Sequence, residues 1–423
     1  MDTRIEQSPP LPPRSLGAIF DPLSPDQLED PYPVYAQARR EPVFYSTKYD
    51  VWVVTRYQDL SAVLRDTVRF SSVGSLEAKT EPSARVRAVL SEGYVEFLSL
   101  VQSDPPDHTR IRNVFNKAFS PQHVAAMEDN VRAIATDLID GFVRDGEADL
   151  VTRFAFPLPG AVICSLLGVP RADLSQIKLW STAKQILMAA SVPEDQQVAA
   201  AHDFVALQRY FRGHIEDRVK SPQKDLLTLL APNEIGGTAP LTMQEAVSNA
   251  IDLLAAGHET TTDLIGNGAA LLMAHPDQMA QLRADLGLLP AAIDEILRME
   301  APVRGLFRRV TSKAELGGAT IPEGARLFIL YSSGNRDESE YADAEKFDIH
   351  RKEGAPHLSF SKGIHYCVGN ALARLEGRVA FELLLRRLPG LRRHPTLKSV
   401  RRPYLILRGF EHLPVQWDAP AAG

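Results

Sequence analysis

The amino-acid sequence predicts a mainly α-helical protein with small β-sheets. Between residues 107 and 286, apolar side chains recur at three- and four-residue spacing, which is typical of amphipathic helices. Short segments rich in Val, Ile, Tyr and Phe, bounded by Gly and Pro, occur near both ends of the chain and predict strands. These elements alternate without a clean break, so we expect a flexible leader, residues 1–18, and a single domain, residues 19–423.

The first predicted elements follow the chain in a simple order. Residues 43–56 are expected to form a hairpin and residues 59–64 a short helix. Residues 73–106 read as a long functional loop with one or two short helices. Residues 127–143 and 199–219 have the apolar spacing of amphipathic helices.

The longest predicted helix begins after Thr242 and reaches Ala274. Thr242 and Glu245 have the spacing of a capping box. Residues 250–273 are apolar almost all round, which indicates a helix buried on most sides. The later elements expected are a helix over 290–299, short strands over 315–329, a helix from just after Cys367 to about 387, and a closing hairpin over 405–413.

The composition excludes several functional classes. Lys and Arg number 47 and Asp and Glu 53, so the net charge is −6 and no basic surface for nucleic acid is expected. Two cysteines, Cys164 and Cys367, are too few for a disulfide framework or a four-cysteine metal site. The sequence contains neither a signal peptide nor an apolar stretch of membrane-spanning length, so we expect a cytoplasmic protein.

The two cysteines differ in their local sequence. Cys164 lies in the apolar run AVICSLL and is expected to be a core residue. Cys367 lies in FSKGIHYCVG, just before a helix-forming stretch whose free N–H groups would favour a thiolate. Glycines in this segment would let a flat ligand approach the backbone. The specified positions are Phe360, Gly363, His365, Cys367 and Gly369.

This segment resembles the haem-binding signature of the cytochrome P450 family. The resemblance extends to NRD at 335–337 and LAR-x-E at 372–376, and it covers the chain from about residue 22 to 415. It implies the cytochrome P450 fold, with haem b bound through Cys367 as the axial ligand and the other specified positions beside it. Ser361 departs from the family pattern, which usually has glycine there.

Residues 255–263, AAGHETTTD, lie within the long apolar helix. An acid and an alcohol side by side in such a helix are costly unless they are used. The segment resembles the family's oxygen-activation motif, which implies that Ala256 and Gly257 lie beside the haem. It also implies that Thr260 hydrogen-bonds dioxygen and that Glu259 feeds protons from solvent. We expect Thr260 to bond back to the preceding turn as well and to widen the helix there.

The segment DPPDHTRIR, residues 104–112, places His108 and Arg112 on one helix face. The resemblance implies that both point at a haem propionate, together with His365 and Arg308. Buried carboxylates need cationic partners, which is the chemical reason for such a cluster. Arg309 adjoins Arg308, so the last assignment is open by one residue.

Glu295 and Arg298 form an E-x-x-R pair on one helix face. On its own, this spacing is typical of an exposed ion pair that adds little to the free energy of unfolding. The resemblance implies instead a buried structural pair that ties its helix to the segment before Cys367. Arg351 is the expected third member.

The resemblance also implies where a substrate would bind. An apolar lining predicts a largely apolar small molecule. Asp252 and Arg304 are candidate anchors for a polar substrate group; the alternative is that they pair with each other or reach solvent. The candidate lining residues are Leu90, Val95, Leu98, Ala255, Ala256, Val303, Leu306 and Leu405.

The resemblance implies a monooxygenase that inserts one atom of O2 into a C–H or C=C bond. No dinucleotide-binding fold and no cluster ligands follow Cys367, so a separate ferredoxin and its NAD(P)H-dependent reductase are the expected electron donors. The alternatives are a peroxide-driven peroxygenase and a non-catalytic haem sensor or carrier. A basic docking face near Cys367 would comprise Arg110, Lys117, Lys362, Arg374 and Arg378.

Overall fold

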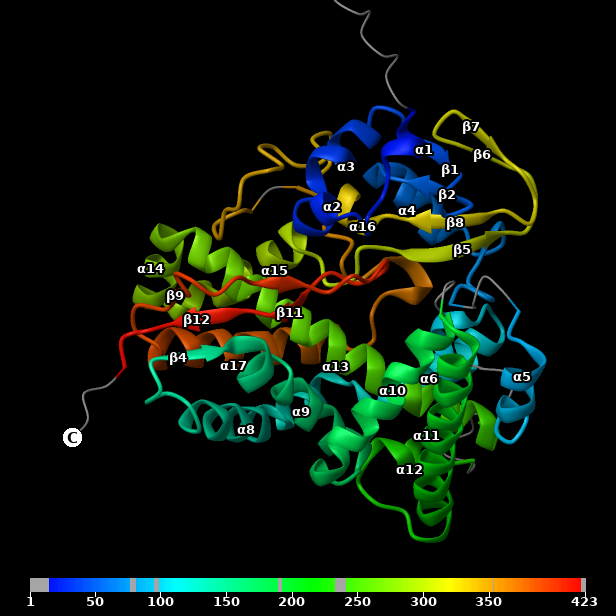
Figure 1. The fold of residues 1–423 in the computed structure, drawn as a ribbon, viewed down its shortest axis with the longest axis horizontal. Helices are drawn as coiled ribbons and strands as arrows, with labels where there is room; N and C mark the ends of the chain where they lie inside the picture. Colours follow the sequence, from blue (N-terminus) through cyan, green and yellow to red (C-terminus); the bar gives the residue numbers. More distant parts are fainter. Residues whose placement is uncertain are drawn as a thin grey trace, which may run out of the picture.

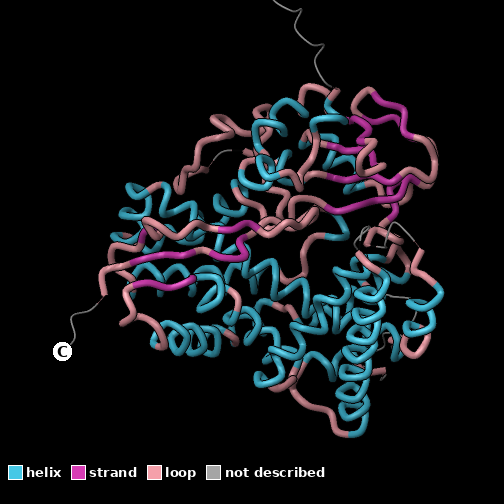
Figure 2. Tube along the Cα trace, viewed as in Figure 1, coloured by secondary structure: helices cyan, strands magenta, loops and turns pink. Residues whose placement is uncertain are grey.

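The computed structural model describes residues 15–76, 81–94, 99–188, 192–232, 241–352 and 354–419. Most strands of the largest sheet lie with short N-terminal helices in the upper part of Figure 1, and the longer helices lie below them. Figure 2 shows a second band of strands near the C-terminus. None of the helices in the described ranges combines the length and the hydropathy that a membrane crossing needs.

The largest sheet has five strands in the order β1-β2-β8-β5-β3. β1 and β2 form the predicted hairpin, with Val43 opposite Val54. β2 pairs in parallel with β8, and β5 pairs antiparallel with both β8 and β3. The strands are Val43–Ser46 (β1), Val51–Val54 (β2), Phe70–Ser71 (β3), Leu306–Val310 (β5) and Arg326–Ile329 (β8).

Three smaller sheets account for the other strands in the described ranges, whereas the sequence predicts only two sheets in all. The short strands predicted over residues 315–329 are present, but the closing hairpin is displaced. β10 pairs with β11 across a loop at residues 402–409, because Leu405 and Ile406 pack against the N-terminal core instead of forming a strand. These strands are β4 (Glu147–Asp149), β6 (Ala314–Leu316), β7 (Ala319–Ile321), β9 (Arg392–Arg393), β10 (Val400–Arg401), β11 (Phe410–His412) and β12 (Pro414–Gln416).

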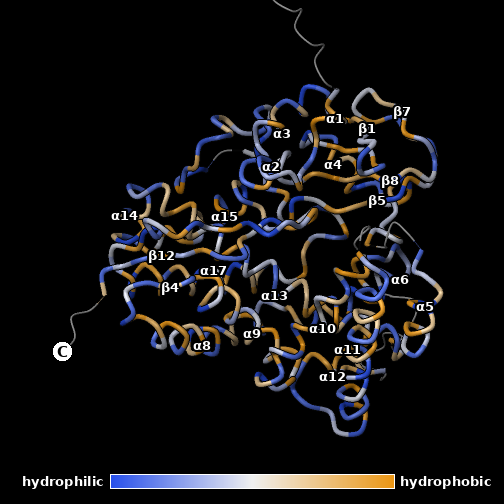
Figure 3. Tube along the Cα trace, in the orientation of Figure 1, coloured by the Kyte–Doolittle hydropathy of each residue, from blue (hydrophilic) through white to orange (hydrophobic). Residues whose placement is uncertain are grey.

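The longer helices agree with the predicted ones in position. Figure 3 shows apolar and polar residues alternating along α8 and α11, as expected for helices packed on one face. The longer helices are α6 (Asp107–Ala118), α8 (Glu128–Asp140), α9 (Pro157–Leu167), α10 (Leu174–Met188), α11 (Glu194–Lys220), α13 (Met243–Ala274), α15 (Leu289–Met299) and α17 (Asn370–Arg387). The shorter ones are α1 (Leu16–Ile19), α2 (Pro25–Glu29), α3 (Tyr32–Ala38), α4 (Tyr57–Arg65), α5 (Ala84–Leu90), α7 (Pro121–Ala126), α12 (Leu226–Leu230), α14 (Pro276–Ala284) and α16 (Tyr331–Gly334).

α13 runs through the middle of the helical part (Figure 1). The Thr242 hydroxyl accepts from the Glu245 N–H, and the Glu245 carboxylate accepts from the Thr242 N–H at 2.8 Å, which confirms the predicted capping box. α9, α11 and α17 pack against α13. Most of its side chains are therefore buried, as its all-round apolar character predicts.

The N-terminal boundary differs from the predicted leader. Leu16–Ile19 form α1, and Gly17 is buried against β1. A Cβ added at Gly17 would lie 2.2 Å from the Tyr45 carbonyl oxygen, so glycine permits this close approach. Residues 16–18 therefore belong to the packed fold and not to the leader.

Candidate active site

Cys367 lies in a tight loop between a single helical turn, Gly363–His365, and α17. Its backbone N–H donates to the Phe360 carbonyl oxygen at 2.8 Å, which closes the loop. Burial raises the pKa of the Cys367 thiol, while a hydrogen bond from the Gly369 N–H opposes that rise. The expected effect of a helix N-terminus on the thiol is therefore present, but burial outweighs it in the protein alone.

The backbone of this loop places specific demands on Gly363 and Ser361, but not on Gly369. Gly363 has φ of 71°, and a Cβ there would lie 2.6 Å from the Leu64 carbonyl oxygen, so the turn against α4 requires glycine. A Cβ at Gly369 would make only an ordinary contact with Phe119, at 3.8 Å. Ser361 has φ of 61°, a conformation that favours glycine, which agrees with the family's usual residue there.

His108, on α6, and His365 lie side by side, with ring centroids 4.4 Å apart. Ser72 Oγ lies 2.9 Å from His365 Nε2, whereas the buried His108 Nε2 has no hydrogen-bond partner. Burial and nearby arginines lower the pKa of His108 to about 4 and that of His365 to about 2. Both rings are therefore neutral in the protein alone.

Arg308 and Arg112 complete this group, which we call the basic cluster (His108, Arg112, Arg308 and His365). Arg308 is 3% exposed on β5 while Arg309 is exposed, so burial favours Arg308 of the two as a partner for a buried anion. Arg112 donates to the Tyr366 carbonyl oxygen at 2.6 Å, beside Cys367. Burial lowers the pKa of both guanidinium groups, which indicates that their charges are poorly compensated.

Haem b fits these residues. Its two propionate carboxylates would supply anionic partners for the basic cluster in addition to Asp104, and an acceptor for the unpartnered His108 Nε2. The Cys367 sulfur is a suitable axial ligand for its iron. Cys164 is fully buried within α9 and makes no such site.

α13 is accessible along the segment that contains Ala256, Glu259 and Thr260, although most of the helix is buried. The Thr260 hydroxyl donates to the Ala256 carbonyl oxygen at 2.5 Å, which is the predicted back-bond. The helix is α-helical throughout Met243–Ala274, so the predicted widened turn is not formed. An acid and an alcohol therefore face an accessible site in the middle of the helical part.

Gly257 lies where α13 packs closely on a neighbouring helix. A Cβ added there would lie 3.1 Å from Ile163 Cδ1 on α9. The glycine thus permits close packing of α13 on α9. The sequence correctly indicates a close approach at this position, and α9 makes one such approach.

Glu295 and Arg298 are both buried on α15 and form two hydrogen bonds, at 2.7 and 2.9 Å. Arg351 Nε donates to Glu295 Oε1 at 3.1 Å. Arg298 also donates to the carbonyl oxygens of Asn335 and Ala344 at 2.9 and 2.7 Å. These bonds tie α15 to the irregular segment before Cys367, in agreement with the predicted structural role.

The candidate lining residues fall into several groups. Val95 and Leu98 lie outside the described residues. Ala255 and Ala256 are accessible on α13, while Leu90 packs against the helical core that contains Cys164. The three that pack against cores near the five-stranded sheet are Val303, Leu306 and Leu405.

Asp252 and Arg304 do not pair with each other. Arg304 is 1% exposed and donates to the Pro22 carbonyl oxygen at 3.0 Å, so it faces the N-terminal segment and cannot anchor a substrate. Asp252 Oδ1 instead binds Lys184 Nζ on α10 at 2.6 Å. The alternative that the two residues pair with each other is therefore not realised, because each has a different partner.

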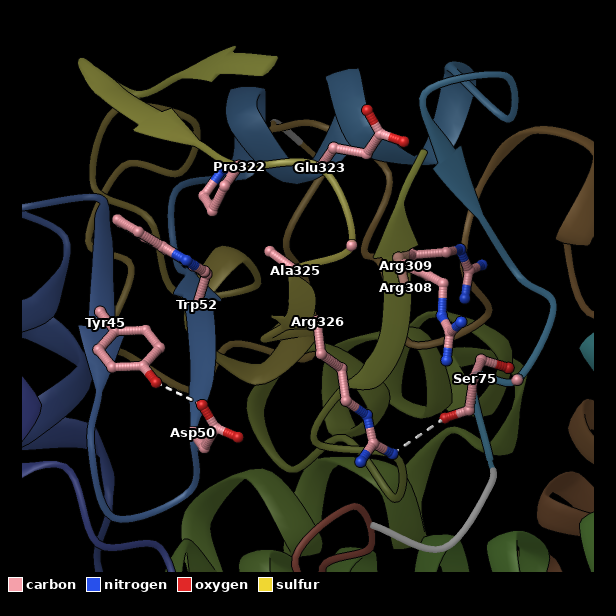
Figure 4. A pocket seen from close by; sticks show the side chains of 12 residues that line it. Tyr45, Asp50, Trp52, Ser75, Arg308, Arg309, Pro322, Glu323, Ala325 and Arg326 are labelled. Atoms are coloured by element: carbon pink, nitrogen blue, oxygen red, sulfur yellow. Dashed lines mark hydrogen bonds between the residues drawn. The ribbon is translucent and has the colours of Figure 1, made fainter. Parts of the chain in front are cut away.

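A cavity of about 450 Å³ opens between the β1–β2 hairpin and the turn before β8 (Figure 4). Arg308, Arg309 and Arg326 lie on one side of it and Tyr45 and Trp52 on the other. Its lining includes no described residue of α13 or of the Cys367 loop. This polar cavity is therefore not the expected apolar substrate pocket.

Three polar residues near the site were not predicted from the sequence: Ser72, Asp263 and Arg402. Ser72 contacts His365, as described above. Asp263 is buried on α13 and forms an ion pair with Arg402 from the loop 402–409. The position of Asp263 four residues after Glu259 signals a shared helix face. The contacts of Ser72 and Arg402 depend on the tertiary fold and have no sequence signal.

Comparison with known proteins agrees with this site. The family model described as Cytochrome P450 matches residues 196–389. Cytochrome P450 monooxygenase PikC of Streptomyces venezuelae is 36% identical over 97% of this chain and 95% of its own. The 6-deoxyerythronolide B hydroxylase of Saccharopolyspora erythraea is 36% identical over 92% of this chain and 96% of its own.

Solved structures share the fold along nearly the whole chain. P450BioI in complex with hexadec-9Z-enoic acid ligated acyl carrier protein has a TM-score of 0.83 at 31% identity, and the match covers 93% of this chain and 100% of that one. The chain therefore belongs to the cytochrome P450 family, whose monooxygenases bind haem b through a cysteine thiolate.

Proposed function

We propose that this monooxygenase inserts one oxygen atom of O2 into a C–H or C=C bond of a largely apolar small molecule. The observation that carries the proposal is the accessible Thr260 hydroxyl beside Glu259 in an otherwise buried helix. Such a pair is suited to moving protons where bulk water is excluded.

In this proposal Cys367 is the axial ligand and the basic cluster binds the propionates. When bound, haem supplies the activation of dioxygen, and its thiolate ligand favours O–O cleavage. The hydrogen bond from the Gly369 N–H stabilises negative charge on the sulfur. The short turn that Gly363 allows holds this loop against α4.

The side chains of α13 would control protons and substrate. The Ala256 carbonyl oxygen fixes the direction of the Thr260 hydroxyl, and the accessible Glu259 carries protons from solvent. Asp252 is a candidate contact for a polar substrate group, because its buried Oδ2 has no hydrogen-bond partner.

The names of similar proteins support an apolar substrate. One relative is a 6-deoxyerythronolide B hydroxylase, and the P450BioI structure contains hexadec-9Z-enoic acid ligated to acyl carrier protein. Another similar structure, CREJ, has a TM-score of 0.87 and contains (4-ethylphenyl) dihydrogen phosphate. All three molecules have a hydrocarbon part and at least one oxygen-containing group, which is the class we propose for this chain.

A separate ferredoxin and its NAD(P)H-dependent reductase would supply electrons at the face beside Cys367. Ile364 and Tyr366 are each 38% exposed there, close in sequence to the partly exposed Lys362, and Lys117 on α6 is also exposed. An apolar centre with a basic rim suits transient docking of an acidic protein. Arg110 does not belong to this face, because it binds Glu245 on α13. Arg374 and Arg378 form ion pairs with Asp294 and Glu128.

The proposed docking face has its own test. A Lys362→Glu variant should slow reduction by an acidic ferredoxin at low salt and lose this difference at high salt. Stopped-flow reduction over a salt series measures the effect. Equal rates for both proteins at every salt concentration would contradict the proposed face.

The substrate and the electron source are tested together on the haem-loaded enzyme. 6-Deoxyerythronolide B and hexadec-9Z-enoic acid are the first probes, and their binding is read from the haem absorbance. Product that requires NAD(P)H, reductase and ferredoxin supports the proposal. Product formed with hydrogen peroxide, but not with NAD(P)H, reductase and ferredoxin, would indicate a peroxygenase. Binding of a probe without turnover under either condition would indicate a sensor or carrier.

The role of Thr260 has a matched control on the same helix. The buried Thr262 hydroxyl makes the same kind of back-bond, to the His258 carbonyl oxygen at 2.9 Å. We expect Thr260→Ala to divert NAD(P)H oxidation towards hydrogen peroxide, whereas Thr262→Ala should behave as wild type. Equal peroxide yields from the two variants would contradict the assignment.

A further inference from the structure

One face of α13 carries three polar side chains at four-residue spacing: Glu259, Asp263 and Asn267. Residues at this spacing are neighbours on a helix surface. Polar groups are costly on a helix that is otherwise buried and apolar, so this row requires partners. The loop 402–409, between β10 and β11, supplies them.

Asp263 is enclosed by this loop. Its carboxylate forms an ion pair with Arg402, and its side chain is fully buried while that of Arg402 is 16% exposed. A Cβ added at Gly409 would lie 1.7 Å from Asp263 Oδ1. The Arg402 N–H donates to the Gly409 carbonyl oxygen at 3.1 Å, so both ends of the loop meet at this carboxylate.

Asn267 attaches the same loop one turn further along α13. Its side chain accepts from Arg401 and donates to the Arg408 carbonyl oxygen, both at 2.8 Å. The loop is therefore attached at two successive turns of the helix. This attachment holds the loop, and Arg402 with it, on the face of α13 that carries Asn267, Asp263 and Glu259.

Glu259 and Arg402 are also linked electrostatically. Burial opposes the charged form of Arg402, but Asp263 and then Glu259 favour it, and the pKa of Arg402 is raised overall. Lys178 on α10, Tyr404 on the loop and Asp263 itself also interact electrostatically with Glu259. The guanidinium of Arg402 thus contacts Asp263 and also lies in the electrostatic field of Glu259, one helical turn away on α13.

We propose that Arg402, held by Asp263, is a positioning residue that keeps Glu259 beside Thr260 and so limits the loss of reducing equivalents to hydrogen peroxide. The inference rests on the proposed function, in which Glu259 feeds protons to this site.

The test compares Arg402→Gln, Arg402→Lys and the control Arg401→Gln in the haem-loaded enzyme. Arg401 adjoins Arg402 but faces Asn267 and Glu300, and glutamine keeps a donor for Asn267. Hydrogen peroxide released per NADPH is measured without added substrate, using a plant-type ferredoxin and its reductase. We expect Arg402→Gln to raise this ratio by at least about threefold and to change the solvent isotope effect on NADPH oxidation. Arg402→Lys keeps the positive charge and should release nearly as little hydrogen peroxide per NADPH as wild type. Arg401→Gln should release the same amount as wild type.

Two further comparisons assign the effect to specific contacts. In a Glu259→Gln background, Arg402→Gln should have no additional effect; an equal effect in both backgrounds would overturn the inference and leave the proposed function intact. A wild-type peroxide yield from Glu259→Gln alone would instead overturn the assignment of the acid.

Urea unfolding gives a readout independent of turnover: Arg402→Gln and Asp263→Asn should be non-additive by about fivefold in the unfolding equilibrium constant. Additive effects would show that Asp263 does not hold Arg402.

Discussion

Cys164 and Cys367 have opposite surroundings. Cys164 lies inside α9, in a core with Leu167 and Ile251, and burial raises its pKa to about 11. Cys367 lies in a loop that is supported by a backbone N–H at its sulfur and by the basic cluster beside it. Burial acts on both thiols, so burial alone does not distinguish them. Cys367 differs in having polar neighbours that favour a negatively charged sulfur, which suits it to bind a metal.

The largest expected effect is the loss of the thiolate ligand. Cys367→Ser should abolish the absorbance band typical of ferrous haem with a thiolate ligand and carbon monoxide, because serine provides no sulfur for the iron. Cys164→Ser should retain this band. The ferrous carbon monoxide spectrum of each purified variant measures the difference, and an unchanged spectrum for Cys367→Ser would remove the basis of the comparison.

The second expected effect concerns the support of the Cys367 loop. Glu295→Gln removes one charge from a buried network and leaves Arg298 without its counter-ion, so we expect a loss of about 3–5 kcal/mol in the free energy of unfolding. The control Glu128→Gln breaks exposed ion pairs with Arg132 and Arg378 and should cost less than about 1 kcal/mol. Urea unfolding measures both. Similar losses would show that the buried network gives the loop no special support.

The third expected effect concerns the basic cluster. Arg308→Leu removes a buried cation and should weaken haem binding by about tenfold, the effect of one charge-assisted hydrogen bond. Arg309→Leu, at the adjacent exposed position, should bind haem as wild type does. The rate of haem transfer to excess apomyoglobin measures both variants. Faster transfer from Arg309→Leu than from Arg308→Leu would reverse the assignment.

Much of this fold and site is local in the sequence and was predictable. The capping box of Thr242 and Glu245, the span of α13 and the loop motif around Cys367 depend on residues close together in the chain. The widened turn within α13 is a local prediction that was wrong. The contacts that were missed join distant segments of the chain. Arg304 binds the carbonyl oxygen of Pro22, and Gly257 accommodates a side chain of α9; neither contact has a periodicity or motif that could reveal it.

The displaced hairpin has a similar cause. Residues 405–407 are apolar, which predicts a strand, but Leu405 and Ile406 pack against the N-terminal core. Tertiary packing therefore outweighs local propensity there. Asp263 is the instructive intermediate case: its spacing from Glu259 was readable, whereas its partner Arg402 was not.

The smallest expected effect lies at the edge of the core around Cys164, where Asp252 binds Lys184. Both side chains are 17% exposed, so water already screens the pair, and we expect Asp252→Asn to cost about 1 kcal/mol or less in the free energy of unfolding. Glu92→Gln, which breaks an exposed pair with Arg209, is the control for loss of a surface charge. Urea unfolding of both variants measures the difference. A loss as large as that of Glu295→Gln would mean that the core around Cys164 also depends on a charge network. The two cysteines would then differ only in the groups that directly contact their sulfur atoms.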